Sequence, residues 1–198
     1  MNPRIAVALL LLGLLALGAI LLAAGGDDDA DPVAADNAFA GALMPEGLPA
    51  PDFELENQEG ERVSMRSLRG QPVLVTFLYT HCEDSCPAQA QVVKGALAEL
   101  DEPVPALAVA VDPPNDTQQS ARRFLVEQRV AGLDFVLGSR AELKPLWKGF
   151  AIRPQAIQDE HQARFTLVDK RGYQRIGFPG EYATPELLAH DLRLLQEE

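Results

Sequence analysis

Apolar and polar positions follow two different periods along the chain after residue 50. Residues 52–65 alternate apolar and polar side chains about a glycine, which predicts a small hairpin. Residues 72–80 (PVLVTFLYT) are continuously apolar and rich in β-branched and aromatic side chains, as in a strand buried on both faces. Residues 85–100 repeat apolar positions with helical spacing and place Pro87 in the first turn. The pattern therefore predicts a buried strand followed directly by a helix.

The alternation of strand and helix patterns continues to the C-terminus. Further strand patterns occupy residues 105–112, 133–138 and 163–178, the last being two strands joined at a glycine turn. Further helical patterns, each preceded by residues that can cap a helix N-terminus, occupy residues 115–130, 140–150 and 184–198. Helices between parallel strands, followed by a terminal hairpin and helix, predict an α/β protein with a thioredoxin-like fold, in which helices cover a mixed central sheet.

The start of the chain predicts a membrane segment. Residues 5–24 carry no charge and are about as long as a helix that crosses the ~30 Å hydrocarbon core. The apolar part of a cleavable signal is usually ~7–15 residues, so residues 1–24 predict an uncleaved N-terminal transmembrane helix, with a cleaved signal peptide as the alternative. Arg4 before this run and the acidic cluster after it predict a cytoplasmic N-terminus and a body on the exported, periplasmic side.

The rest of the chain is predicted to be a tether followed by one domain. Residues 25–49 are rich in Ala, Gly, Asp and Pro without a sustained period, which predicts a flexible acidic linker. Residues 50–198 are then long enough for one domain of ordinary size. The chain has a net charge of −12, and its lysines and arginines do not cluster, which excludes nucleic acid as a partner.

Both cysteines of the chain lie at the end of the first buried strand. The predicted order places Cys82 just after that strand and Cys86 in the first turn of the next helix, an edge of an α/β sheet where functional sites form. Their spacing brings both sulfurs within reach of each other or of a shared ligand. The helix N-terminus should favour the thiolate form, whereas the charges of Glu83 and Asp84 oppose it.

Three roles are open for this pair. A structural disulfide would close so short a loop that it would restrict the unfolded chain only slightly. A reversible dithiol could exchange electrons with another protein's disulfide. Two thiolates could also bind a soft metal, and Cu(I) needs only two or three soft donors, whereas a closed zinc site needs four ligands. Three histidines could supply a third ligand: His81 beside the first cysteine, His161 before the strand expected next to the cysteine-bearing one, and His190 on the last helix.

Three motifs resemble, in order, those of the Sco/SenC family of membrane-anchored copper-handling proteins. They are THCEDSCP (residues 80–87), VDPPNDT (residues 111–117) and the histidine ahead of RFTLVD. The likeness covers roughly residues 47–196. It implies that Cys82, Cys86 and His161 bind one copper ion, as Cu(I) or Cu(II), for assembly of the dinuclear copper site of cytochrome c oxidase subunit II. Another exported copper protein is the alternative partner.

The resemblance also raises questions about individual residues. Asp112 and Asp116 match the family's second motif and are expected to orient the site or a partner, with helix capping as the competing role for Asp116. Glu83 stands where the family usually has proline, which adds a negative charge beside the sulfurs. The alternative function is a membrane-anchored thiol–disulfide oxidoreductase, with Cys82 and Cys86 as its catalytic redox pair, forming a disulfide when oxidised.

Overall fold

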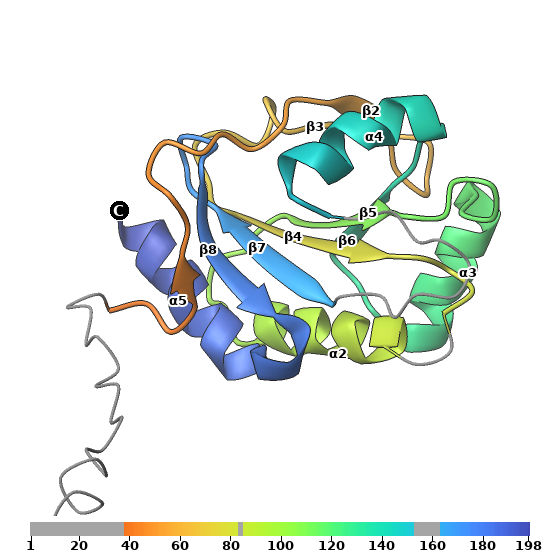
Figure 1. Cartoon of the computed structure of the whole chain (residues 1–198). Helices are drawn as coiled ribbons and strands as arrows, with labels where there is room; N and C mark the ends of the chain where they lie inside the picture. Colours follow the sequence, from red (N-terminus) through yellow and green to blue (C-terminus); the bar gives the residue numbers. More distant parts are fainter. Residues whose placement is uncertain (1–37, 83–84, 153–162) are drawn as a thin grey trace, which may run out of the picture. The chain divides into compact units, whose positions relative to one another are not determined.

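A six-stranded sheet forms the centre of the computed structural model, which describes residues 38–82, 85–152 and 163–198 (Figure 1). In spatial order its strands are β1 (Ala42–Leu43), β8 (Gln174–Pro179), β7 (Arg164–Val168), β4 (Val73–Leu78), β5 (Ala106–Ala110) and β6 (Leu133–Val136). Strands β4, β5 and β6 run parallel, whereas β7 is antiparallel to β4 and β8 is antiparallel to β7. The predicted mixed sheet is confirmed, and β7 lies beside the strand that leads to the cysteines.

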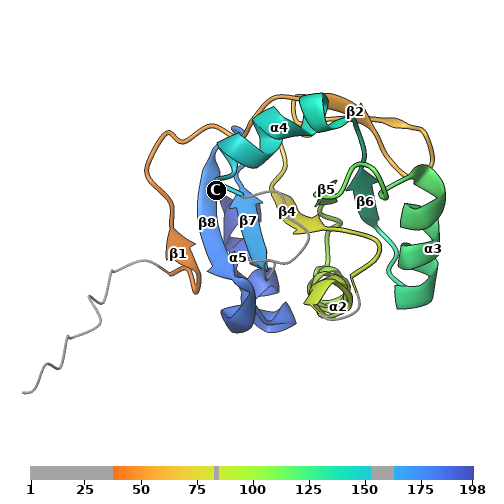
Figure 2. The ribbon, with the colours of Figure 1, turned by 45° about the vertical axis from the view of Figure 1, so that its right-hand side comes forward.

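Helices cover both faces of this sheet, as expected because every residue of β4 and β5 is buried. The helices are α2 (Ser85–Ala98), α3 (Gln118–Gln128), α4 (Arg140–Gly149) and α5 (Pro185–Glu197), with a short 3-10 helix η1 (Gly180–Tyr182) before α5. Figures 1 and 2 show α2 and α5 together on one face and α4 on the opposite face. The core is therefore a sheet between two layers, which leaves the ends of the strands as the place for a site.

Each α-helix after α2 begins at a residue whose side chain caps it. Thr117, Ser139 and Thr184 accept hydrogen bonds from backbone N–H groups of the first turns of α3, α4 and α5. Ser139 and Glu142 form a capping box at the start of α4. These caps fix where the three connecting loops end, including the loop of the second motif before α3.

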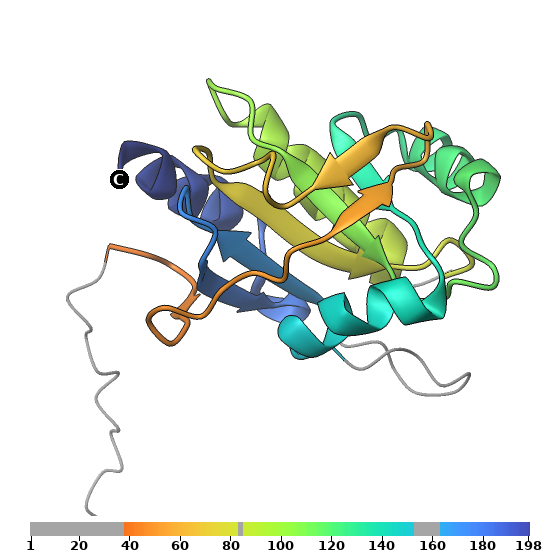
Figure 3. The same cartoon turned by 90° about the horizontal axis from the view of Figure 1, so that it is seen from above.

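The predicted hairpin forms between β2 (Glu54–Glu56) and β3 (Arg62–Ser64). Figure 3 shows it lying over the sheet on the same side as α4. It is a separate two-stranded sheet, joined to the domain through its turn, its side chains and a β-bridge between Glu56 and Leu137.

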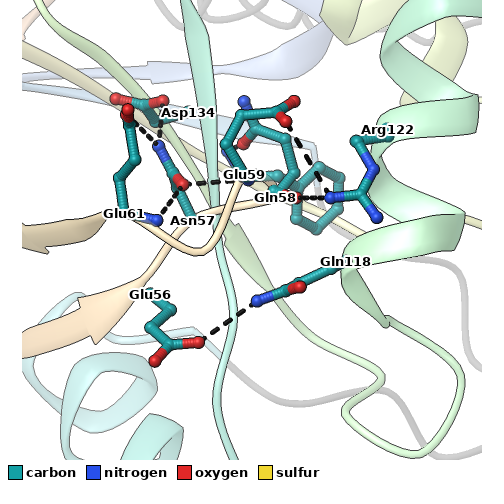
Figure 4. Close-up of polar contacts among 9 residues, drawn as sticks. Glu56, Asn57, Gln58, Glu59, Glu61, Gln118, Arg122 and Asp134 are labelled. Atoms are coloured by element: carbon teal, nitrogen blue, oxygen red, sulfur yellow. Dashed lines mark hydrogen bonds and ion pairs between the residues drawn. The ribbon is translucent and has the colours of Figure 1, made fainter.

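The turn of the hairpin covers the free edge of β6 (Figure 4). The N–H of Phe135 donates to Oε1 of Gln58 at 2.7 Å, and the N–H of Leu137 donates to the carbonyl of Glu56 at 2.9 Å. Arg122 of α3 donates to the carbonyl of Gln58, which fastens the turn to the neighbouring helix. Because an uncovered edge strand can pair with other chains, this cover leaves the edge with few free donors.

The described segment before residue 50 differs from the predicted flexible linker of residues 25–49. Strand β1 lies inside that range and pairs with β8. Just before it, the N–H groups of Ala40 and Gly41 donate to the buried carboxylate of Asp191 at 2.7 and 2.9 Å. A two-residue strand is too short to produce a period in the sequence, and its partners on β8 lie about 135 positions away, so local patterning gives no sign of it.

Several predictions concern residues outside the described ranges. Within residues 38–82, 85–152 and 163–198, no helix is long and apolar enough to cross a membrane. The predicted anchor of residues 1–24 lies outside these ranges. So do Glu83 and His161, so the structure does not test their predicted roles.

Candidate metal centre

The two cysteines occupy the positions predicted from the pattern. Strand β4 ends at Leu78, a turn follows in which the N–H of Cys82 donates to the carbonyl of Tyr79, and Cys86 is the second residue of α2. Both side chains are thiols and both are buried, with Cys82 8% exposed and Cys86 0%. The pair therefore lies at the carboxyl end of a parallel strand, under the surface rather than on it.

The two cysteines contact each other directly. The N–H of Cys86 donates to Sγ of Cys82 at 3.2 Å. The hydroxyl of Ser85 lies 3.7 Å from the same Cys82 sulfur. An amide from the start of α2 thus points at the first cysteine of the pair, and both thiols are available to one bound ion or to each other.

Burial decides the protonation of the second cysteine. It raises the pKa of the Cys86 thiol far above the usual range, and the hydrogen bond to Cys82 and the nearby charge of Asp116 raise it further. A backbone hydrogen bond at Tyr79 opposes these effects but is outweighed. The helix N-terminus was expected to favour the thiolate form of the pair and Glu83 and Asp84 to oppose it; for Cys86, loss of solvent is the largest effect and favours the thiol. A metal that binds here must displace the proton of Cys86.

Asp116 connects the two loops that follow β4 and β5. Its carboxylate is 5% exposed and accepts from the N–H of Thr80 at 2.8 Å and from the N–H of Asp112 at 3.0 Å. Thr117, rather than Asp116, caps α3, so the capping role considered for Asp116 is wrong. Burial raises the pKa of Asp116, although these amide bonds pull it down. Asp116 thereby holds the chain two residues before Cys82.

Asp112 has a more local role. It is partly exposed, its carboxylate accepts from Nδ2 of Asn115 at 2.7 Å, and its carbonyl accepts from the N–H of Asp116 at 2.9 Å. These contacts keep the loop of the second motif in one shape. They support the carboxylate of Asp116 and give Asp112 no described contact with either sulfur.

The described histidines are not near both sulfurs. His81 is exposed and its Nδ1 lies 3.2 Å from the hydroxyl of Thr80. His190 is half exposed on α5, where its Nδ1 lies 2.9 Å from Asp191. Among the residues described, no three side chains of the types His, Cys, Asp and Glu form a group that could hold a metal. Two soft donors are therefore in place, and a third has to come from outside the described ranges or from a partner.

One buried polar pair near the cysteines was not singled out from the sequence. Gln89 lies three positions after Cys86 on α2 and is 4% exposed. The hydroxyl of Thr76 lies 3.1 Å both from Oε1 of Gln89 and from the carbonyl of Arg164. This bridge joins the cysteine-bearing helix to β4 and to the first residue of β7. The sequence signal was a glutamine at a position with the helical spacing of the core.

A large groove begins beside the sulfur pair. It has a volume of about 820 Å³ and lies between one face of α2, the start of β7 and the end of β8. A second cavity of about 560 Å³ is lined by Asp116, the hairpin, the start of α3 and Glu142 of α4, with uncharged residues and one arginine among its carboxylates. A mostly apolar groove and a more polar cavity thus adjoin the loops of the site.

The family models and the curated proteins both match this chain to Sco proteins. The family model described as SCO1/SenC matches residues 45–196. Among curated proteins, the SCO1 protein homolog of Bacillus subtilis is 29% identical over 145 residues, which cover 67% of this chain and 75% of that protein. The mitochondrial SCO2 homolog of mouse is 37% identical over 89 residues, 41% of this chain and 35% of its own length. The chain thus spans about a third of that mitochondrial relative.

Solved structures match over most of the described chain. BsSco, described as having a disulfide switch and as a member of the Sco family of cytochrome c oxidase assembly proteins, is 26% identical with a TM-score of 0.68, covering 76% of this chain and 95% of that one. ScoI of Bradyrhizobium japonicum, solved with copper bound, is 29% identical with a TM-score of 0.64, covering 74% and 99%. The predicted thioredoxin-like architecture agrees with these neighbours.

Proposed function

Because this chain belongs to the SCO1/SenC family, we propose that it is a copper carrier that serves the assembly of cytochrome c oxidase. The cargo is one copper ion, held by Cys82, Cys86 and His161. The receiver is the dinuclear copper site of subunit II or another exported copper protein. The observation that carries the proposal is the pair of buried thiols at the start of α2, where the N–H of Cys86 donates to the sulfur of Cys82. The family match spans all three proposed ligands.

The donor set suits Cu(I) as a substrate. Thiolates are soft ligands, and Cu(I) is satisfied by two or three such donors with imidazole as a further ligand. Burial keeps water away from the sulfurs, and the Asp116 carboxylate fixes the loop that carries Cys82. Uptake takes the proton from Cys86, and delivery proceeds when the cysteines of a docked partner replace those of this chain at the ion.

The proposal includes membrane attachment. Residues 1–24 would anchor the chain, with the domain on the periplasmic side. Since the backbone is already fastened to Asp191 at Ala40 and Gly41, the tether would consist of residues 25–37 rather than 25–49. A tether of this length, if it behaves as the flexible linker expected from its composition, would span about 20 Å on average.

A second function is favoured by one feature of the pair. The backbone N–H of Cys86 already donates to the sulfur of Cys82, so the two side chains that a disulfide would join are neighbours. A disulfide switch is described for BsSco. The chain could accordingly act as a thiol–disulfide oxidoreductase on the partner's cysteines, and the disulfide form could not hold copper.

The test is an anaerobic Cu(I) titration of the reduced full chain in detergent against a competing chelator. Wild type should bind one ion, and His161→Ala should bind it at least about tenfold more weakly, since one ligand is lost. His190→Ala is the matched control, because that histidine contacts Asp191 and should leave the affinity unchanged. Reduction of a model disulfide is measured on the same proteins. Weak binding that is indifferent to His161, with normal reductase activity, would reject the carrier and favour the oxidoreductase.

A further inference from the structure

The start of α2 brings two polar groups to one sulfur. The N–H of Cys86 donates to Sγ of Cys82 at 3.2 Å, and the hydroxyl of Ser85 lies 3.7 Å from the same sulfur. Sulfur is larger than oxygen, so hydrogen bonds that involve sulfur are longer than those between oxygen atoms. Among the described residues, the Ser85 hydroxyl has no other hydrogen-bond partner. The first two residues of α2 therefore both contact the sulfur of Cys82.

The direction of the Ser85 contact is fixed once a metal is bound. Between a thiol and a hydroxyl, either atom can be the donor. A metal-bound cysteine is a thiolate, whose sulfur has no proton and can only accept. The hydroxyl of Ser85 then has to donate, and it can rotate to do so. The contact thereby becomes a charge-assisted hydrogen bond, which is stronger than one between neutral groups.

A donor at the sulfur acts unequally on the two oxidation states of copper. Two thiolates with Cu(I) carry a net negative charge, whereas the same thiolates with Cu(II) carry none. A hydrogen bond to a thiolate sulfur stabilises the more negative complex more, because the sulfur keeps more of its charge there. Hydrogen bonding around a cysteine sulfur tunes the redox potential of copper sites in the same way. The Ser85 hydroxyl therefore favours Cu(I).

The surroundings of the pair favour the other oxidation state. Both cysteines are buried, and burial disfavours the complex that keeps a net charge. The carboxylate of Asp116 lies close enough to act on Cys86, and its charge also opposes a negative complex. A site that carries Cu(I) here depends on the donors that reach its sulfurs. The amide of Cys86 belongs to the backbone, so Ser85 is the side chain that supplies such a donor to Cys82.

We propose that Ser85 is a positioning residue that sets the preference of this site for Cu(I) over Cu(II), by donating a hydrogen bond from its hydroxyl to the sulfur of Cys82. The proposal rests on the proposed function, in which Cys82, Cys86 and His161 bind copper. It adds the oxidation state of the cargo and the side chain that decides it. Ser85 acts through the sulfur and does not bind the ion itself.

Two variants separate the hydroxyl from the bulk of the side chain. Ser85→Thr keeps the hydroxyl and adds a methyl group, whereas Ser85→Val has a second methyl group in place of the hydroxyl. Both new side chains are β-branched, so they affect α2 alike, and Ser85 is partly exposed, which leaves room for them. Urea midpoints of the two copper-free variants should therefore agree.

The experiment titrates the reduced full chain in detergent, anaerobically, with Cu(I) and separately with Cu(II), each against a competing chelator. Free thiols are counted after each Cu(II) titration, and the affinity is taken from samples in which both cysteines are still reduced. The absorption of bound Cu(II) is recorded on the same samples. Wild type, Ser85→Thr and Ser85→Val are compared by the ratio of their Cu(I) affinity to their Cu(II) affinity.

Ser85→Thr should keep the wild-type ratio, and Ser85→Val should lower it at least about threefold. The thiolate-to-Cu(II) absorption should move to lower energy in Ser85→Val alone, a change that a merely structural role of Ser85 would not produce. Equal ratios in the two variants, or a higher ratio in Ser85→Val, would overturn the proposal. Failure of the proposed function would instead appear on wild type, as weak Cu(I) binding that is indifferent to His161.

Discussion

Replacing Asp116 tests how the cysteine loop is held. Its carboxylate accepts from two backbone N–H groups, those of Thr80 and Asp112, at 2.8 and 3.0 Å. Asp116→Ala removes both bonds and leaves the two amides without an acceptor in a buried place. Each orphaned amide costs about 1–3 kcal/mol, which gives roughly 2–6 kcal/mol for the pair. The carboxylate is itself costly to bury, as its raised pKa indicates, so we expect the lower part of this range, about 2–3 kcal/mol.

Urea unfolding monitored by tryptophan fluorescence measures this cost, because Trp147 is the one tryptophan of the chain and is buried. Asp112→Ala is the control. The Asp112 carboxylate accepts one described bond, from Asn115 near the surface, so this variant's free energy of unfolding should fall by less than about 1 kcal/mol. Cu(I) affinity should also fall in Asp116→Ala, since Cys82 follows Thr80 by two residues. If Asp116→Ala is no less stable than Asp112→Ala, the carboxylate does not hold the loop.

The pH dependence of the same site has a definite sign. An acid whose pKa is raised on folding binds its proton more tightly in the native state, so ionisation lowers stability. The stability of wild type relative to Asp116→Asn should therefore decrease as the pH rises from the ordinary value of about 3.8 through the higher native value. Urea midpoints of both proteins at several pH values measure it. If the stability of wild type relative to Asp116→Asn instead increased with pH, the amide bonds, rather than burial, would dominate the pKa of Asp116.

Three further predictions concern Cys86, Asp191 and Trp147. In Cys82→Ser, the thiol of Cys86 should react with iodoacetamide more slowly at pH 8 than it does in urea, because burial raises its pKa; equal rates would contradict this. Asp191→Ala should free the two amides ahead of β1 and increase hydrogen exchange there, while exchange in β5 stays unchanged. Trp147→Phe loses the hydrogen bond to the carbonyl of Ala110, so its free energy of unfolding, followed by circular dichroism, should be about 1–3 kcal/mol lower than that of wild type. An unchanged free energy of unfolding would mean that the bond contributes nothing to stability.

Most of the fold could be predicted because its signals are local. The buried strands are continuous apolar runs, and the helix starts carry capping residues such as Ser139 and Thr184. The sulfur pair was found for the same reason, since both cysteines lie within one turn of a predicted strand end. Pairing of β7 beside β4 followed from the order of the elements.

The features that could not be predicted from the sequence depend on contacts between distant parts of the chain. Asp116 meets Thr80 across 36 positions, and the N-terminal segment meets Asp191 across about 150. No periodicity or motif in the sequence indicates such contacts. Gln89 is an intermediate case: its position on the buried stripe of α2 was visible, but its contact with Thr76 on β4 required the sheet to be in place.

Cys86 shows why charge states are poorly predicted from sequence. The helix N-terminus and the neighbouring acids are local features, whereas burial, the largest influence on the pKa of Cys86, is a property of the whole fold. The same burial bears on the proposed function. A site whose thiol holds its proton tightly makes copper compete with that proton, so the apparent affinity at neutral pH is lower than two buried sulfurs would otherwise give. Copper uptake in the proposed function is therefore expected to be linked to pH through the proton of Cys86.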